Sequence, residues 1–468
     1  MKRPILILAA IAGIIVPGPL AAQTDAVLYS FTNGSDGADP VAGLLLANGR
    51  LYGTSSKGGP ATDGTVFSVN PDGTGYRVLH GFAGPPDGAH PLGKLALAGN
   101  LLYGTTSGGG SNSFGTVFAL NTNGDAYGYA VLYHFNPSSN GVMPSAGLTL
   151  AGGTLYGTAS GAGYGNPGWG TVFAINTNGV PYTALYNFSV PSGTPLANAD
   201  GEQPLSDLVL SGGKLYGTAY GGGAIGYGTV FSLGTDGSNF SVLHAFSNAP
   251  DGAFPQSGLT LGGTTLFGTT QIGGTNGNGT LFAVNTDGSG YSVLHHFLTN
   301  GVDGLRPHAV LTLSGRTLYG TTRGGGGTLH GTVFSISTNG LGYTVLSDFT
   351  NTPDGANPES ELLYSGSTLY GTTEAGGSSI WGTVFGLTIP PLKITGLTPA
   401  GTNLMLNVVN AVAGETYTLL TSSNVTLPLS QWTPAASNLP ATNPSFTFTV
   451  TNAVTPGQPQ QFYLLEAQ

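Results

Sequence analysis

The chain has 468 residues, of which 80 are glycine and 30 are proline, and only 7% carry a charge. The net charge is −10, and lysine and arginine form no cluster beyond Lys2-Arg3, which argues against nucleic acid as a partner. Cysteine is absent, so disulfides, thiol catalysis and thiolate metal sites are excluded. The glycines recur at fixed places beside Val, Leu, Phe and Tyr, which is typical of turns in a β protein.

The N-terminus predicts an export signal. Lys2 and Arg3 precede an apolar run at residues 5–16, and small residues follow at 17–22. This order is typical of a secretory signal peptide, which we place at residues 1–22. The alternative is a membrane anchor, but the apolar run is short for a bilayer span, and no later segment is a transmembrane candidate. We therefore expect a secreted or cell-surface protein.

A unit of about fifty residues recurs seven times. In the third copy it reads Leu155-Tyr156-Gly157-Thr158, followed by Gly170-Thr171-Val172-Phe173. The aromatic residue of the first half recurs at steps of 51, 53, 60, 51, 52 and 51 residues: Tyr52, Tyr103, Tyr156, Tyr216, Phe267, Tyr319 and Tyr370. A fixed period of this length with four short strands per unit predicts the blades of a β-propeller.

Turn residues divide each repeat into four strands. In the third repeat these are residues 147–150, 154–158, 170–176 and 182–188, with an Asn178-Gly179 hairpin before the last. The chain begins with an isolated copy of the fourth strand at residues 26–31, and the last repeat lacks one. We expect residues 26–31 to complete the last blade and close a ring, with the first strand of each blade innermost.

The repeat pattern ends at Pro390-Pro391. Residues 392–468 contain alternating apolar and polar runs separated by polar turns, which predicts a small β-sandwich of the immunoglobulin or fibronectin kind. We interpret Trp432 as core packing, with sugar stacking by its indole as the alternative. The predicted fold is thus all-β: a seven-bladed β-propeller at residues 26–387 followed by a C-terminal β-sandwich.

The quoted units, Leu-Tyr-Gly-Thr followed by Gly-Thr-Val-Phe, resemble the GloVer tandem repeat over residues 26–387. This is a glycine-rich repeat of exported bacterial proteins, and kelch-like propellers are its nearest structural analogue. The resemblance implies a secreted or surface location in a bacterium. It implies no reaction, ligand or catalytic residue.

A second motif, Asp-Gly-Ala-x-Pro, lies between the fourth strand of one repeat and the first strand of the next. Its aspartates, including two in diverged copies, are Asp36, Asp87, Asp200, Asp251, Asp303 and Asp354, and Asn140 replaces the aspartate in the third repeat. We interpret the aspartates as turn residues that accept backbone N–H groups. The alternative is a ring of calcium ligands, although calcium takes six to eight oxygens and each blade supplies one carboxylate. We predict no other cofactor and no metal site.

The loops between the second and third strands should emerge on the same face as these turns. They vary most between repeats and span residues 55–63, 106–114, 159–169, 219–227, 270–278, 322–330 and 373–381. Variable loops on a rigid ring favour recognition, and aromatic side chains with few charges suit sugars or peptides. The candidate binding residues are Phe114, Tyr164, Trp169, Tyr227, His330 and Trp381. The alternative is that each aromatic side chain covers the loop of its own blade.

The remaining polar residues select no catalytic site. His80, His244 and His295 share one strand position that elsewhere holds Tyr or Ser, so we interpret it as facing partial solvent. Four glutamates could contribute to glycoside hydrolysis, but no spacing selects a pair: Glu202, Glu359, Glu361 and Glu374. We expect a monomeric binding module with a glycan or protein ligand. The alternatives are a secreted carbohydrate-active enzyme with carboxylates at the tunnel mouth, and a scaffold without a small ligand.

Overall fold

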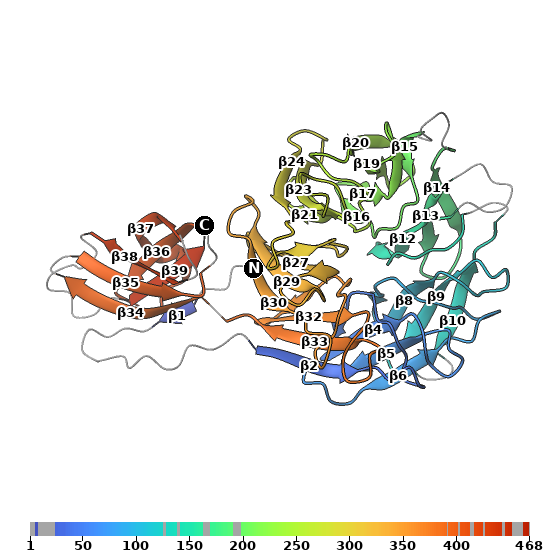
Figure 1. Ribbon diagram of the computed structural model, residues 1–468, viewed down its shortest axis with the longest axis horizontal. Coiled ribbons are helices and arrows are strands. Elements are labelled where there is room, and N and C mark those ends of the chain that lie inside the picture. The colour runs from blue at the N-terminus through green and yellow to red at the C-terminus, as the bar shows by residue number, and fades with distance from the viewer. Residues whose placement is uncertain are drawn as a thin grey trace.

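Small antiparallel sheets arranged in a ring make up most of the computed structural model (Figure 1). The structure describes residues 5–7, 24–124, 128–137, 141–161, 169–190, 198–390, 392–400, 403–411, 416–424, 426–441, 445–451 and 462–467. Apart from one 3-10 turn, Leu429–Gln431, the regular elements of these residues are β-strands. The predicted all-β class is therefore confirmed.

Seven four-stranded sheets in the described residues share one antiparallel order. The first strands are β3 (Leu45–Ala47), β7 (Ala96–Ala98), β11 (Thr149–Ala151), β16 (Val209–Ser211), β21 (Thr260–Gly262), β26 (Thr312–Ser314) and β31 (Leu363–Ser365). The second strands are β4 (Arg50–Ser55), β8 (Leu101–Thr106), β12 (Thr154–Ala159), β17 (Lys214–Ala219), β22 (Thr265–Thr270), β27 (Thr317–Thr322) and β32 (Thr368–Thr373). The third strands are β5 (Thr65–Val69), β9 (Thr116–Asn121), β13 (Thr171–Asn176), β19 (Thr229–Gly234), β23 (Thr280–Asn285), β29 (Thr332–Ser337) and β33 (Thr383–Thr388). The fourth strands are β6 (Arg77–Gly81), β10 (Tyr129–His134), β14 (Tyr182–Asn187), β20 (Ser241–Ala245), β24 (Ser292–His296), β30 (Thr344–Asp348) and, for the last repeat, β2 (Thr24–Ser30).

The fourth strands lie on the perimeter of the ring in Figure 1. The first strands of neighbouring repeats contact one another. For example, β7 contacts β11 and β21 contacts β26, so the first strands lie toward the axis. Two short extra pairs, β15 (Asn198–Glu202) with β18 (Gly221–Gly223) and β25 (Gly304–Leu305) with β28 (Gly324–Gly325), extend the connections of repeats four and six.

The core explains the glycine of the Leu-Tyr-Gly-Thr motif. Gly157 pairs with Phe173 across β12 and β13, and a Cβ added at Gly157 would lie 2.6 Å from Cζ of that ring. The phenylalanine is fully buried at this position in six repeats and 5% exposed in the seventh: Phe67, Phe118, Phe173, Phe231, Phe282, Phe334 and Phe385. A side chain in place of the glycine would displace the ring, so every repeat keeps both residues.

The last repeat meets the first through the same contacts that join consecutive repeats. Thr105 Oγ1 donates to the carbonyl oxygen of Ala146 in the next repeat at 2.7 Å, and Thr372 Oγ1 donates to that of Ala42 at 3.2 Å. β2 pairs with β33 from Thr24 opposite Thr388 to Ser30 opposite Thr383. The strand at residues 26–31 thus occupies the outer edge of the sheet of the last repeat.

Stacked rings join neighbouring fourth strands around the outside of the ring, a region that we call the outer rim. A ring near the end of one fourth strand stacks on the ring that begins the next, with centroids 3.6 to 4.1 Å apart. The six pairs are Tyr29–Tyr76, His80–Tyr129, Tyr133–Tyr182, Tyr186–Phe240, His244–Tyr291 and His295–Tyr343. Between repeats six and seven the two positions hold Ser347 and Asp25, and the serine hydroxyl donates to the carboxylate.

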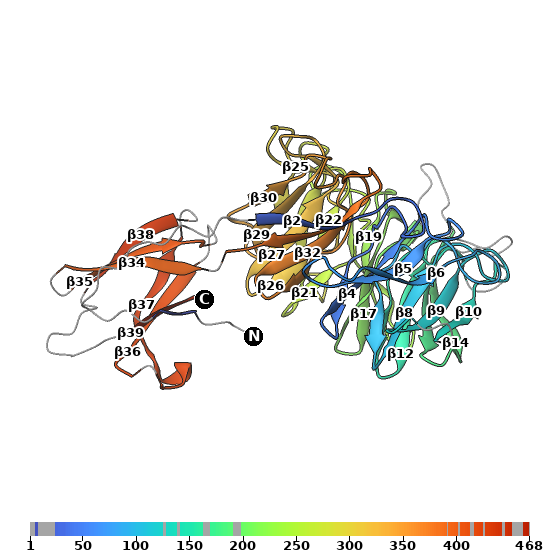
Figure 2. The ribbon, with the colours of Figure 1, turned by 90° about the horizontal axis from the view of Figure 1, so that it is seen from below.

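The C-terminal strands form two further sheets beside the ring. Figure 2 shows the ring edge-on with these sheets next to it. One sheet contains β34 (Lys393–Ala400), β35 (Asn403–Val409) and β38 (Ser445–Val450). The other has the order β1 (Ile5–Ile7), β39 (Phe462–Ala467), β36 (Thr416–Ser422) and β37 (Thr433–Pro440). Trp432 is 5% exposed and packs with Leu420, Phe462 and Leu464, which confirms that it belongs to the core. Of the predicted signal peptide, the structure describes only Ile5–Ile7.

Candidate functional site

The turns before the first strands and the loops after the second strands meet on one face of the ring. The backbones of Ala38 and Lys57 form a β-bridge, and Ser56 N donates to the carbonyl oxygen of Asp39 at 3.1 Å. The residue before the turn proline has a positive φ, between 52° and 59°, in every repeat: Asp39, His90, Met143, Gln203, Phe254, Arg306 and Asn357. None of these seven is glycine, although this conformation is costly for other residues.

The turn aspartates are held by donors that shortly precede or follow them in the chain. The Asp36 carboxylate accepts hydrogen bonds from Thr32 N at 2.9 Å, Thr32 Oγ1 at 2.6 Å, Gly34 N at 3.1 Å and the Tyr29 hydroxyl at 3.0 Å. A backbone N–H likewise binds each of the others: Asp87, Asp200, Asp251, Asp303 and Asp354. Among the described residues no group of three His, Asp or Glu side chains is placed to hold a metal ion.

The histidines on the outer rim contact these aspartates, which the sequence did not indicate. Nε2 of His80, His244 and His295 lies 3.0 to 3.1 Å from the turn aspartate that follows it. Tyr29 and Tyr186 donate to Asp36 and Asp200 from the same strand position. Burial lowers the pKa of His244 even though Asp251 favours its charged form. The position does face solvent in part, since the three histidine side chains are 18 to 19% exposed, and a ring there also links the outer rim to the turn.

The candidate loop aromatics do not converge on one site. Phe114, Tyr227 and Trp381 are half-buried and pack against hydrophobic clusters between repeats. Trp169 is 39% exposed, and His330 is half-buried with its backbone bridged to Gly325. Tyr164 and Asn140 lie outside the described residues. The backbone carbonyl at this loop position binds the next repeat, as Trp169 O does when it accepts from Gln203 N at 2.7 Å.

A cavity of about 250 Å³ lies on the axis, just before the first strands. In each repeat, the third residue after the turn proline lies at the cavity, and most of these seven residues line it. We call the ring that they form the channel neck: Gly43, Lys94, Gly147, Asp207, Gly258, Val310 and Glu361. Glycines alternate with larger residues around most of the neck. A Cβ at Gly43 would lie 3.1 Å from Cβ of Glu361, and one at Gly147 would lie 3.0 Å from Oδ2 of Asp207. The glycines thus leave the space that neighbouring side chains occupy.

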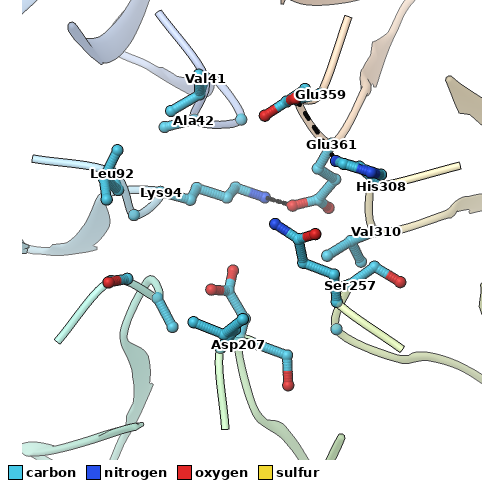
Figure 3. Close-up of a pocket in the computed structure, with 18 residues that line it drawn as sticks. Val41, Ala42, Leu92, Lys94, Asp207, Ser257, His308, Val310, Glu359 and Glu361 are labelled. Carbon is cyan, nitrogen blue, oxygen red and sulfur yellow. Dashed lines mark hydrogen bonds and ion pairs between the residues drawn. The ribbon is translucent and has the colours of Figure 1, made fainter. Parts of the chain in front are cut away.

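Charged groups from three repeats meet in the channel neck (Figure 3). Lys94 Nζ lies 2.7 Å from Oε2 of Glu361, a residue 267 positions away. Asp207 enters from the opposite side, and its Oδ1 accepts from Gly147 N at 2.5 Å. Burial and the negative charge of Glu361 raise the pKa of Asp207 to about 6. Burial opposes the charge of Lys94, but Glu361 holds the pKa of that ammonium above its ordinary value.

A chain of polar contacts leads from the loop face into the cavity. The Tyr220 hydroxyl donates to Oε1 of Gln271 at 3.2 Å, and Nε2 of Gln271 lies 2.9 Å from Nε2 of His308. If the amide donates there, the neutral imidazole carries its proton on Nδ1, which is 3.5 Å from Glu359 Oε1. Nε of Arg323 lies 2.5 Å from the same oxygen, and its Nη2 donates to Oε2 of Glu374 at 3.0 Å.

This chain breaks the symmetry of the repeats. The residue after the second strand is Ser56, Ser107 and Ser160 in repeats one to three, and each hydroxyl donates to the carbonyl oxygen of its own turn, at 3.0 to 3.1 Å. In repeats four to seven the same position holds Tyr220, Gln271, Arg323 and Glu374, whose side chains reach neighbouring repeats. We call these four residues, with Phe254, His308 and Glu359, the channel mouth.

Aromatic rings flank the mouth at repeats four and five. The rings of Tyr220 and Phe254 stack with centroids 5.0 Å apart, and Tyr227 meets Phe254 edge-on at 5.7 Å. All three side chains are half-exposed. Of the candidates from the sequence, Tyr227 adjoins this cluster, Glu359 and Glu361 line the cavity, Glu374 lies at its mouth, and Glu202 is in β15.

The sequence interpretation missed Lys94, Asp207, Tyr220, Phe254, Gln271, His308 and Arg323 as a group. The available signal was departure from the repeat: a charge where other repeats have glycine, and a large side chain where three repeats have serine. No sequence distance indicates that repeats two and seven flank repeat one, so that their side chains meet beside Gly43.

The sheets and their ring define a β-propeller-like all-β repeat protein. The sequence model of the Gloeobacter/Verrucomicrobia repeat family matches residues 10–198, 126–330 and 290–404, so the chain belongs to this family. The predicted GloVer resemblance is thereby confirmed. No curated protein matches the chain.

The solved structures that match this chain are distant in sequence. The extracellular domain of a proposed one component system from B. thetaiotaomicron matches at a TM-score of 0.50 with 11% identity, over 85% of this chain and 43% of that one. TolB from Acinetobacter baumannii matches at 0.39 with 13% identity over 62% of each chain. A nidogen/laminin complex matches at 0.38 with 15% identity over 61% of this chain and 89% of that one. With 11% identity, the first of these matches shows a shared fold alone. Within the described part of the chain, no helix is long and apolar enough to cross a bilayer.

Proposed function

We propose that this protein is an exported recognition module, in which a seven-bladed β-propeller presents a ligand site at the channel mouth and a C-terminal β-sandwich follows. The signal peptide at residues 1–22 belongs to this proposal, and its removal would take β1 from the edge of β39. The extracellular origin of the B. thetaiotaomicron neighbour and the family membership support an extracellular interaction role. The turn aspartates serve as structural residues in this proposal, with no calcium bound.

The observation that carries the proposal is the continuous path from the Tyr220–Phe254 ring pair through Gln271 and His308 to the axial cavity. A small-molecule site typically combines an apolar or aromatic wall with a few convergent polar groups. A sugar ring can lay its C–H face on an aromatic side chain while amide, imidazole and carboxylate groups bind its hydroxyls. We infer that the ligand is a carbohydrate that lies across the mouth.

The backbone conformation at this face also supports a role for its side chains in ligand binding. Seven residues with positive φ precede the turn prolines, and glycine would remove the strain at each one. Glycine is common elsewhere in the chain and occupies most other positive-φ positions. The retention of seven different side chains here is expected of a surface whose side chains contact a ligand.

The test is a glycan-array screen of the mature protein beside a Tyr220→Ser/Gln271→Ser variant. The substitutions install the serine of repeats one to three, so the fold should be kept. We expect the wild type to bind a restricted set of glycans and the variant to lose at least about tenfold in affinity. The reason is that stacking on an aromatic ring together with one hydrogen bond contributes about 1–3 kcal/mol. Trp169→Ala is the matched control on the outer loops. Loss of binding in the control alone would move the site to the loops.

A second candidate function is hydrolysis of a glycosidic bond. The observation that favours it is the presence of Asp207 and Glu361 in one cavity, with the pKa of Asp207 raised to about 6 by burial and by Glu361. A carboxylic acid whose pKa is raised to about 6 remains partly protonated just below neutral pH, so it can protonate a leaving oxygen while an ionised partner acts as base or nucleophile. Release of reducing ends from a bound glycan by the wild type, but not by Asp207→Asn, would establish this activity.

A further inference from the structure

The channel neck contains one carboxylate more than it has cations to pair. Lys94 and Glu361 neutralise each other at 2.7 Å, and Gly43 leaves them the space to meet. Asp207 has a single contact of known geometry, the hydrogen bond from Gly147 N, and none of the lysines, arginines or histidines in the described ranges forms an ion pair with it. Its carboxylate points into the cavity toward the Lys94–Glu361 pair (Figure 3).

The raised pKa of Asp207 indicates which kind of ligand the neck would favour. Removal from water and the charge of Glu361 make the ionised form costly at neutral pH. A cation placed between Asp207 and Glu361 would stabilise both carboxylates. The neck is therefore electrostatically suited to a positive group that the protein itself does not supply.

We propose that the channel neck is a subsite for a protonated primary amine, so that the ligand at the mouth is an amino-bearing saccharide whose ammonium lies against Asp207. This inference rests on the proposed function and adds the chemical class of the ligand. The cavity of about 250 Å³ is near the lower end of ligand pockets, so it admits one small ring or the end of a longer chain.

A metal ion fits the neck less well than an amine. Calcium takes six to eight oxygen ligands, whereas the ammonium of Lys94 occupies part of the neck and already binds Glu361. In the described ranges no three acidic or histidine side chains form a metal-binding group. An ammonium needs only a few acceptors, and Asp207, Glu361 and Gln256 line the same cavity.

The test compares two oligosaccharides that differ only in whether their amines are acetylated. The full mature protein is titrated at pH 7 with a glucosamine tetramer and with its fully N-acetylated counterpart, by calorimetry. We expect the free amine to improve the affinity about tenfold, as a charge-assisted hydrogen bond does. Asp207→Asn keeps an acceptor for Gly147 N and should abolish this preference. Asp287→Asn, which removes the same charge from an exposed hairpin on the opposite face, should leave it unchanged.

The outcomes separate the two proposals. Equal binding of both tetramers, or a preference that survives Asp207→Asn, would overturn the amine subsite and leave glycan recognition standing. If neither tetramer binds the wild type, recognition of these glycans fails, and the subsite is tested with n-butylammonium alone. That probe should raise the melting temperature of the wild type but not of Asp207→Asn. An equal effect on both proteins, or none on either, would overturn the subsite as well.

Discussion

The outer rim and the channel mouth are built from the same seven repeats, but the outer rim keeps the repeated residues and the channel mouth departs from them. On the outer rim six of seven junctions carry the same stacked pair of rings, with one exception at Asp25 and Ser347. At the mouth three repeats carry a serine bonded to its own turn, and four carry large side chains that reach their neighbours. Repetition stabilises the ring, because each junction buries the same groups, whereas recognition of a ligand without sevenfold symmetry requires departures from the repeat.

The largest effect should come from breaking the repeated interior. Gly157→Ala would place a Cβ 2.6 Å from the ring of Phe173, and overpacking of this kind costs about 1–3 kcal/mol. The matched control is Gly386→Ala in β33, where an added Cβ meets nothing closer than 3.5 Å. We expect urea denaturation to show a clear loss of stability for Gly157→Ala and none for the control. Equal stabilities would mean that the glycine is not required by packing.

Regularising the exceptional junction should have the next largest effect. Asp25→Tyr with Ser347→His would give repeats six and seven the ring pair found at the other junctions. Aromatic pairs contribute about 0.5–1.5 kcal/mol beyond the area that they bury, so we expect the double variant to gain about 1 kcal/mol in free energy of unfolding. Each single variant, measured in the same way, should gain less than the pair does. Additive single effects would show that the two rings do not interact.

The same junction should make stability depend on pH. Partial removal from water raises the pKa of the Asp25 carboxyl in the folded chain, despite the hydrogen bond from Ser347, and Asp354 adds to the rise. A carboxyl with a raised folded-state pKa favours folding when protonated, so its contribution is lost as pH increases from about 4 through the folded pKa. Asp25→Asn should therefore be more stable than the wild type at pH 7, with a difference that shrinks toward pH 4. Thermal melts across this range give the comparison, and a pH-independent difference would contradict it.

The smallest effect concerns the neck. Lys94 lowers the pKa of Asp207, although burial and Glu361 raise it to about 6 overall. Lys94→Met removes this stabilising charge, so the pKa of Asp207 should increase further. Carbon NMR of labelled aspartate, with Asp207→Asn to assign the signal, would measure the change. A fall in that pKa would show that Glu361 moves away from Asp207 once its partner is gone.

The sequence predicted what one repeat determines by itself. The period, the four strand signals and the Gly-Thr-Val-Phe unit follow from residues close together in the chain, and Trp432 could be assigned to the core from its apolar surroundings. The roles of His80, Lys94 and Asp207 depend on neighbouring or opposite repeats, as the 267-residue separation of Lys94 and Glu361 illustrates. A search for departures from the repeat would have selected these positions, but only the ring shows that they face one another.

The pairing of β2 with β33 also dictates when the ring can be completed during synthesis. β2 is among the first strands to leave the ribosome, and its partner is the last strand of the ring to be made. Until β33 is made, β2 lacks its partner strand, and the ring that Thr372 and Ala42 join across 330 residues stays incomplete. A nascent chain that stalls between residues 348 and 383 therefore holds six complete sheets and an open edge at both ends, a state prone to pairing with other chains.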